Sequence, residues 1–384
     1  MNTARFFLNL ASLPNSVSHY ESEQGHAYLV SGLDEVRMVL EQHSDFSCPS
    51  HPYRCLYGLL SPAGCKWLGI TSPTIDSRVF IQKIHDFFKT YSGNLALCEQ
   101  SINSGIPISE GFYLEVKTMY LIFSLKLLFD FDLKENATEI SQASCVIEEL
   151  RARFGFSSPP DKYKYFISQE RVAKRIFNKL AKDIQTHCGK KPSDTITHAI
   201  QETILNAVVP LAYTFIWAIL LLGRDEHTQY KILQQRTVTN FSRASLLRGP
   251  CIAAIKETLR LYPPAWALGR TCTNVKTLGG HVINPGDAVI ISPYALHRMR
   301  SYWDKPGHFF SSRFESNCLK QTSFIPFGAG GRICPAAQWN EIILVKAVGY
   351  FIERYSFNTK KFPREKPLVA LRPDRNFALS IYRR

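Results

Sequence analysis

A long apolar run dominates the hydrophobic pattern of this chain. It extends from Ile204 to Leu222, and the residues that interrupt it are Asn206, Pro210, Tyr213 and Thr214. Such a run approaches the length needed to cross a membrane, but a helix that is apolar on all sides also suits the centre of a large helical domain. We interpret the run as a central helix that ends at Gly223-Arg224-Asp225.

Shorter patterns predict further helices and strands around this run. Leu33 to Gln42, Cys251 to Leu261 and Ile342 to Phe357 have the apolar spacing of helices. Gly25 to Val30 has the pattern of a strand. The sequence Pro285-Gly286 predicts a turn that opens a β-branched strand.

Length and composition predict one domain. The 384 residues, 45% of them hydrophobic, can bury a large core. No linker rich in proline, glycine or serine, internal repeat or charge block divides the chain, so we interpret residues 1–384 as a single domain. The excess of 46 basic over 32 acidic side chains gives a net charge of +14, but these charges are dispersed and do not alternate with aromatic residues. We therefore expect no nucleic-acid partner.

The cysteines indicate a reducing compartment. The chain has 10 cysteines but no Cys-x-x-Cys spacing and no local cluster, which argues against zinc ribbons, iron–sulfur clusters and a small disulfide framework. The segment Met1 to Tyr20 lacks the charged start and long apolar run of a signal peptide. We expect a cytoplasmic protein.

One cysteine lies in a setting suited to binding a metal ion. Phe327 to Ala336 forms a glycine-rich turn that carries Cys334 and runs into a predicted helix. Glycines let the backbone pass close to a flat ligand, while backbone amides and the start of the helix stabilise a negative sulfur. Arg332, two residues earlier, can pair with a carboxylate. A lone cysteine in such a turn is more often a small buried apolar residue. The spacing of its neighbours therefore decides whether Cys334 is interpreted as a metal ligand.

The spacing of Phe327, Gly330, Arg332 and Cys334 resembles the haem-binding loop of cytochromes P450. The resemblance implies the fold of that family, which is mainly α with small β-sheets in a single triangular-prism-like domain. It also implies a haem b whose iron is bound by the Cys334 thiolate, with Phe327, Gly330 and Arg332 around the cofactor. The family usually has glycine two positions after the cysteine, where this chain has Ala336.

A second set of residues resembles the structural triad of the same family. Glu257 and Arg260 are three positions apart, which places both charges on one face of the predicted helix. Their order resembles the family's Glu-x-x-Arg helix, and Arg313 follows Trp303-Asp304-Lys305-Pro306 as the third member of the triad does. The resemblance implies that these three residues hold the haem loop and take no part in the chemistry.

Two further positions match residues that contact a haem propionate in the family. Arg270 follows Ala265-Trp266-Ala267-Leu268-Gly269 and would face one propionate. Trp67 matches the tryptophan of the family's Trp-x-x-x-Arg helix, although Thr71 occupies the arginine position. A plain core aromatic is the alternative interpretation of Trp67.

The central helix departs from the family at the residues that deliver protons. Monooxygenases of the family carry an acid–alcohol pair there. Counting along the helix places Val209 and Pro210 at the two positions of this pair. A shift of one helical turn would offer Thr214 instead, and the sequence leaves both registers open. Residues near Ala207 and the segment Cys48 to Pro62 are expected to line the substrate pocket.

The resemblance implies a soluble, bacterial-type haem-thiolate oxidoreductase with no membrane anchor and with fewer residues before its first strand than typical members. Hydroxylation or epoxidation of a small organic or natural-product substrate in specialised metabolism is the leading hypothesis. Oxidative cross-linking of aromatic or peptide side chains, without oxygen insertion, is the runner-up. A non-catalytic haem-binding sensor is the alternative from another class.

A separate electron donor is expected, either a ferredoxin or a flavodoxin with an NAD(P)H reductase, because the chain carries no such segment of its own. An acidic donor would dock on the proximal side of the haem. The basic residues predicted to lie there are Lys346, Arg354, Lys360 and Lys361.

Overall fold

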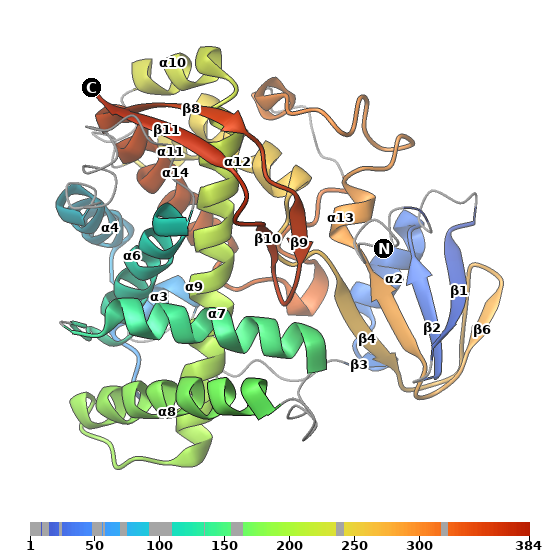
Figure 1. Cartoon of the computed structure of the whole chain (residues 1–384). Coiled ribbons are helices and arrows are strands. Elements are labelled where there is room, and N and C mark those ends of the chain that lie inside the picture. The colour runs from blue at the N-terminus through green and yellow to red at the C-terminus, as the bar shows by residue number, and fades with distance from the viewer. Residues whose placement is uncertain are drawn as a thin grey trace.

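The three-dimensional structure is a computed structural model. It describes residues 15–22, 25–47, 58–69, 75–91, 110–133, 135–154, 164–235, 242–315 and 322–384, together with Asn9 and Leu56. Helices form its larger part (Figure 1). In chain order they are α2 (Leu33–Glu41), α3 (Pro62–Trp67), α4 (Ser77–Tyr91), α6 (Glu110–Phe129), α7 (Ala137–Phe154), α8 (Lys164–His187), α9 (Asp194–Leu222), α10 (Glu226–Gln234), α11 (Arg243–Leu246), α12 (Pro250–Leu261), α13 (Pro293–Leu296) and α14 (Ala337–Arg354).

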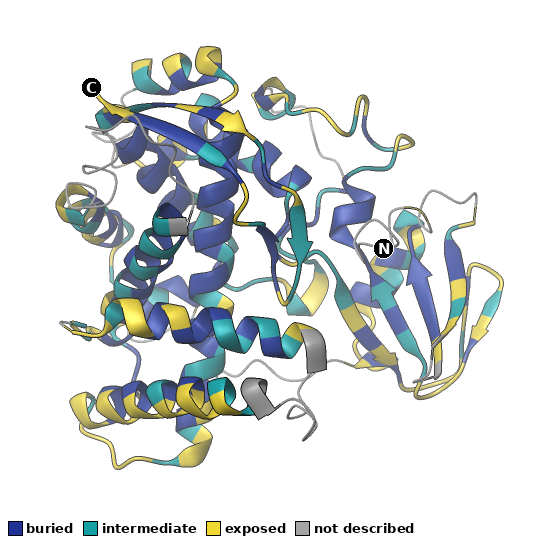
Figure 2. Cartoon of the chain, in the orientation of Figure 1, coloured by how far each residue is buried: buried dark blue, intermediate teal, exposed yellow. Residues whose placement is uncertain are grey.

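The long helix α9 runs through the middle of the molecule (Figure 1). Helices α6, α8, α12 and α14 pack against it. Its length and mean hydropathy of 2.1 would also suit a membrane span, but 83% of its most apolar window is buried inside the protein. Figure 2 shows this burial along the helix, while α8 exposes one side. The prediction of a central helix that ends before Gly223 is therefore confirmed.

Aromatic stacking ties α9 to the elements that carry the candidate site. Trp217 is fully buried on α9, and its ring stacks on Tyr262, at the end of α12, with 3.8 Å between the ring centroids. Its indole N–H donates to the Leu371 carbonyl oxygen at 3.2 Å. The indole of Trp217 thus buries a large apolar surface while its N–H keeps a hydrogen-bond acceptor. α12 is thus fixed against the middle of the core.

A five-stranded sheet and α2 form the β-rich side of the molecule (Figure 1). The strand order is β1-β2-β7-β4-β3. β2 and β7 are parallel, and the other neighbours are antiparallel. The strands are β1 (Val17–Ser22), β2 (Gly25–Val30), β3 (Phe46–Ser47), β4 (Leu268–Cys272) and β7 (Ala288–Ile291).

Three two-stranded sheets complete the β-structure of the described residues. They pair β5 (Lys276–Leu278) with β6 (His281–Ile283), β8 (Tyr355–Lys361) with β11 (Ala378–Arg383), and β9 (Glu365–Pro367) with β10 (Leu371–Pro373).

Most of the elements predicted from the sequence are confirmed. The predicted strand has the bounds of β2, and the predicted helices coincide with α2 and α12 to within one residue at each end. Gly286, with a φ of +96°, forms the expected turn before β7. The predicted end of the last helix is wrong, because α14 stops at Arg354. The apolar residues that follow belong to β8, where they pair with β11.

Candidate active site

Cys334 lies at the end of a tight turn whose backbone depends on glycine. Gly328 and Gly330 have φ angles of +72° and +66°, in the left-handed region that favours glycine. The Cys334 amide donates to the Phe327 carbonyl oxygen at 2.8 Å and closes the turn. A Cβ atom at Gly330 would lie 2.1 Å from the Leu40 carbonyl oxygen, so a glycine is needed for the turn to rest on the end of α2.

The Cys334 thiol is half-buried just before α14 begins at Ala337. Burial raises the pKa of this thiol, and a hydrogen bond from the Ala336 backbone amide partly opposes the rise. A cysteine in this position keeps its proton until a metal ion displaces it. The amide and the positive end of the helix then stabilise the negative sulfur.

Glu257 and Arg260 form a fully buried ion pair on α12. Arg260 donates from Nε and Nη2 to the two carboxylate oxygens of Glu257, each at 2.8 Å, and both side chains have 0% exposure. Arg313, in the 3₁₀ turn Ser311–Phe314, donates from Nε to Oε1 of the same carboxylate at 3.2 Å. The three residues of the predicted triad therefore lie together.

The remaining donors of Arg260 hold a segment of turns that lies earlier in the chain than the turn from Phe327 to Cys334. We call the latter the thiol-bearing turn. Nη1 donates to the carbonyl oxygens of His297 at 2.8 Å and Pro306 at 2.7 Å. Nη2 donates to the His308 carbonyl oxygen at 3.0 Å. The guanidinium thus supplies hydrogen bonds that a helix or sheet would supply elsewhere.

His297 connects the buried ion pair to the thiol-bearing turn. Its Nε2 accepts a hydrogen bond from the Ile325 backbone N–H at 3.0 Å, two residues before Phe327. Its Nδ1 therefore carries the proton and donates to the Arg260 carbonyl oxygen at 3.2 Å. Burial, together with the charge of Arg260, lowers the pKa of His297 to about 3. The ring is neutral at neutral pH.

Arg332 belongs to the same turn, and Arg270 belongs to the strand β4 beside it. Arg332 is half-buried in the 3₁₀ turn Gly330–Arg332. Arg270 is a buried residue of β4, and Leu268 at the start of that strand lies beside Gly328. The expectations that Arg270 faces a haem propionate and that Arg332 pairs with a carboxylate stay predictions.

Trp67 makes a contact that differs from the expected one. It is fully buried, and its Nε1 donates to Oδ1 of Asn340 at 2.8 Å. Asn340 lies in the first turn of α14 and was not singled out by the sequence analysis. Thr71 lies outside the described residues, as does most of the expected pocket segment from Cys48 to Pro62.

The candidates on α9 divide between two faces of the helix. Ala207 and Pro210 are half-buried on one face, beside the exposed Asn206. Val209 instead lines a small cavity with residues of α6, α7 and α8. Thr214 is buried on the Pro210 face, and its hydroxyl donates to the Pro210 carbonyl oxygen at 2.7 Å. The helix continues through Pro210 although proline has no N–H to donate.

A buried polar network lies between α6, α7 and α9. Lys117 Nζ donates to Glu148 Oε1 at 2.6 Å and to Cys145 Sγ at 3.2 Å, and the Tyr213 hydroxyl donates to the same carboxylate. Lys117 and Glu148 are 1% exposed. The sequence analysis missed this network because the residues belong to three separate helices and form no local motif.

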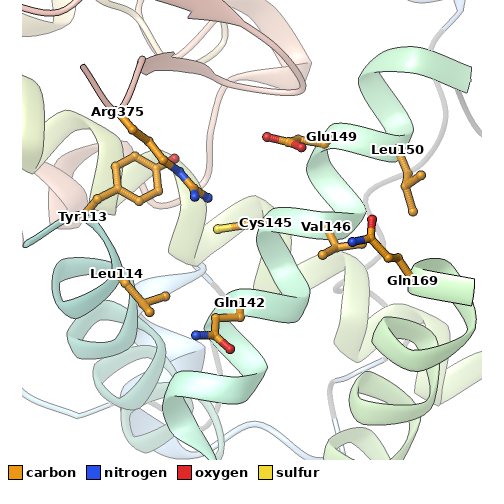
Figure 3. Close-up of a pocket in the computed structure, with 9 residues that line it drawn as sticks. All are labelled: Tyr113, Leu114, Gln142, Cys145, Val146, Glu149, Leu150, Gln169 and Arg375. Atoms are coloured by element: carbon orange, nitrogen blue, oxygen red, sulfur yellow. The ribbon is translucent and has the colours of Figure 1, made fainter. Parts of the chain in front are cut away.

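The pocket in Figure 3 is separate from the thiol-bearing turn. It has a volume of about 410 Å³, and neither the turn nor α9 contributes to its lining. The guanidinium of Arg375 lies beside the Tyr113 ring, 5.6 Å from its centroid, and the Glu149 carboxylate projects from α7. Glu149 is already paired with Arg372 at 2.6 Å. The pocket is therefore not part of the candidate site around Cys334.

The structure contradicts part of the predicted donor-docking surface. Lys346 has 0% exposure, and burial lowers its pKa to about 8, so the prediction of a surface position is wrong. Arg354 is the last residue of α14, and Lys360 and Lys361 end the strand β8 that follows it. The last residue of α14 is about 25 Å from its first residue at 1.5 Å per residue, whereas Cys334 precedes the first residue.

Comparison with known proteins decides the family of the chain. The family model described as Cytochrome P450 matches residues 173–379. The chain belongs to the cytochrome P450 family. The matched region includes α9, the triad, the thiol-bearing turn and α14 of this P450. Membership implies a haem-iron cofactor, and the glycine turn, the half-buried thiol and the two neighbouring arginines fit such a group.

Curated relatives match this P450 over limited segments. Taxane 10-beta-hydroxylase of Taxus cuspidata is 32% identical over 137 residues, and cyclooctatin synthase of Streptomyces melanosporofaciens is 32% identical over 163 residues. These matches cover 34% and 40% of the chain. They cover 27% and 35% of the two relatives, so the chain spans about a third of the length of the relatives it matches.

A solved structure confirms the predicted fold. A P450 from Thermus thermophilus superposes with a TM-score of 0.72 at 17% identity, and the match covers 99% of this chain and 98% of that one. The mainly α fold with small β-sheets is therefore shared by the two proteins. At this level of identity, the likeness concerns the fold alone.

Removing the Glu257 carboxylate should destabilise the protein strongly. We expect Glu257→Gln to lower the free energy of unfolding by about 3 kcal/mol or more, because Arg260 is left buried without its counter-charge. Urea unfolding measures this change. Asp132→Asn, which breaks an exposed pair with Lys126, serves as a control and should cost less than about 1 kcal/mol. Equal losses in the two variants would contradict the account.

Acid should weaken the protein through His297. The unfolded histidine takes up a proton below about pH 6.5, whereas the native ring stays neutral down to about pH 3. Its contribution to stability is therefore complete above about pH 6.5 and is lost as the pH falls toward 3. Between about pH 7 and pH 5.5 we expect wild type to lose about 1 kcal/mol more than His297→Gln in urea unfolding. Parallel pH profiles would show that His297 does not carry this effect.

Proposed function

We propose that this P450 is a haem-thiolate monooxygenase that hydroxylates or epoxidises a small organic or natural-product substrate. The observation that carries the proposal is the glycine turn that rests on α2 and presents the Cys334 thiol at the start of α14. The two curated relatives include a hydroxylase and a synthase of natural products, which supports the substrate class. A haem b is the form of cofactor proposed.

Each part of the site would have one task. Cys334 would bind the haem iron, and Arg270 and Arg332 would pair with the haem propionates. A bound haem would supply the redox chemistry, which a thiolate ligand would promote. Glu257, Arg260 and Arg313 keep the segment before the turn in place and hold no substrate. Phe327 and Gly330 shape the surface that the cofactor contacts.

The α9 face with Ala207 and Pro210 would lie above the haem. Pro210 has no hydroxyl, and the Thr214 proton is directed to the Pro210 carbonyl oxygen. Neither residue delivers a proton in this arrangement. Water that enters beside the exposed Asn206 is the source of protons that we propose, since Glu202, the acid one turn earlier on α9, is paired with Arg151.

The lack of a free hydroxyl at Pro210 and Thr214 favours a second function. Oxidative cross-linking of aromatic or peptide side chains removes hydrogen atoms without inserting oxygen. Such chemistry makes weaker demands on proton delivery, so it suits a helix in which Pro210 occupies the alcohol position and Thr214 is engaged by the backbone.

Metabolite mass spectrometry distinguishes the two functions. Extracts of a producing strain with wild-type protein are compared with extracts of the same strain with Cys334→Ala. We expect a product that depends on Cys334 and is heavier than its precursor by one oxygen atom. A loss of two hydrogen atoms would favour cross-linking instead. Identical metabolites in the two strains, with both proteins expressed, would contradict an enzymatic role.

A revised docking surface follows from the position of Trp339. The Lys66 ammonium lies 5.4 Å and the Arg243 guanidinium 5.2 Å from the centroid of its ring. Trp339 is five residues after Cys334, on the first turn of α14. We propose that an acidic ferredoxin or flavodoxin docks over these two cations, because they lie nearer to the thiol than the far end of α14 does.

Charge reversal tests this surface. Lys66→Glu combined with Arg243→Glu should slow reduction of the haem by an acidic ferredoxin about tenfold or more at low salt, with a smaller effect at high salt. Stopped-flow absorption measures the rate. Lys360→Glu combined with Lys361→Glu changes the charge equally at the end of β8 and should leave the rate near that of wild type. Equal effects of the two pairs would mean that net charge, and not this site, governs docking.

A further inference from the structure

Three side chains form a directed hydrogen-bond chain that ends on the Cys334 sulfur. Trp67 Nε1 donates to Asn340 Oδ1 at 2.8 Å. Asn340 Nδ2 in turn lies 3.9 Å from Cys334 Sγ, within the reach of a long N–H···S contact. These residues come from α3, α14 and the thiol-bearing turn, respectively.

The chemistry of the indole fixes the direction of this chain. An indole nitrogen donates one hydrogen bond and accepts none, so it must face the oxygen of the Asn340 carboxamide. The NH₂ group is then directed to the other side, toward the sulfur. Accepting the indole proton also polarises the carboxamide and strengthens its own donors. The Asn340 orientation therefore depends on Trp67.

Packing holds both partners in place. The Ser61 amide donates to the Leu128 carbonyl oxygen at 2.7 Å and its hydroxyl to that of Leu127 at 2.6 Å, which joins the start of α3 to the end of α6. A Cβ atom at Gly64 would lie 2.5 Å from the Leu128 carbonyl oxygen, so the two helices are in close contact. Trp67 follows one turn later and is 1% exposed.

The Asn340 backbone is equally constrained. Its amide donates to the Ala336 carbonyl oxygen at 2.8 Å in the first turn of α14. The side chain therefore starts from a fixed helical position two residues beyond Gln338 and six beyond Cys334. Little rearrangement is needed for the Asn340 carboxamide to donate a hydrogen bond to a thiolate.

We propose that Asn340 is a positioning residue that donates a hydrogen bond to the Cys334 thiolate, and that Trp67 sets its orientation. The proposal rests on the proposed haem-thiolate function. A hydrogen bond to the ligand sulfur withdraws negative charge from the iron, which favours the reduced state and raises the reduction potential. The single indole proton serves Asn340 and is not left for a haem propionate.

The reduction potential of the haem-loaded protein tests this role. Asn340→Leu keeps the shape of the side chain and removes the donor. We expect its reduction equilibrium to shift toward the oxidised form about fivefold to tenfold, where tenfold corresponds to about 59 mV for one electron. The Soret band of the ferrous carbonyl complex should move to longer wavelength, because the thiolate donates more charge. Gln338→Ala removes a carboxamide from the same helical turn and should change neither quantity.

A double-mutant cycle separates the role of Trp67. Trp67→Phe should shift the potential in the same direction as Asn340→Leu but by less, and it should add nothing in the Asn340→Leu background. The double variant removes both hydrogen-bond partners, so no buried indole N–H is left without an acceptor. The reduction potential of the double variant can therefore still be measured if either single variant folds poorly, and it should show the full shift expected for Asn340→Leu.

The outcomes that would overturn the proposal are distinct. If Asn340→Leu retains haem, thiolate ligation and the wild-type potential, Asn340 does not act on the sulfur. If Trp67→Phe shifts the potential equally in both backgrounds, Trp67 acts without Asn340. If the wild-type ferrous carbonyl spectrum lacks the long-wavelength band of thiolate ligation, the haem-thiolate function fails, and this inference fails with it.

Discussion

The Arg260 guanidinium satisfies the Glu257 carboxylate and three backbone carbonyl oxygens from His297 to His308 within one buried space. Burying such a charge costs several kcal/mol, so the arrangement is stable only if every donor finds a partner. The carbonyls lie in turns that have no strand to pair with. The position of these carbonyls depends on the Arg260 side chain. Through His297, so does the position of Ile325, which precedes the thiol-bearing turn.

The thiol-bearing turn is held from three directions. Gly330 rests on the end of α2, where the Gly331 amide donates to His43 Nε2 at 2.9 Å. His297 holds the approach to the turn from the side of α12. Asn340 and Trp67 lie on the third side, at the start of α14. A thiol held in this way would need little reorganisation to bind a metal ion.

Local patterns explain which features the sequence predicted. Glycines near Cys334 and the i, i+3 spacing of Glu257 and Arg260 depend on neighbours in the chain, so their geometry follows from local rules. The contact between Trp67 and Asn340 joins residues 273 positions apart and leaves no local trace. The family resemblance placed Lys346 on the proximal surface, whereas α14 is buried there. The end of α14 was missed because apolar residues continue into β8.

The proposed function depends most on a sulfur bond between Cys334 and a haem iron. Iron-edge X-ray absorption of the purified haem-loaded protein measures the ligand atoms directly. The account predicts one sulfur scatterer in the first shell of the wild-type iron and its loss in Cys334→Ala. A first shell of nitrogen and oxygen alone in the wild type, or a sulfur that persists in the variant, would contradict it.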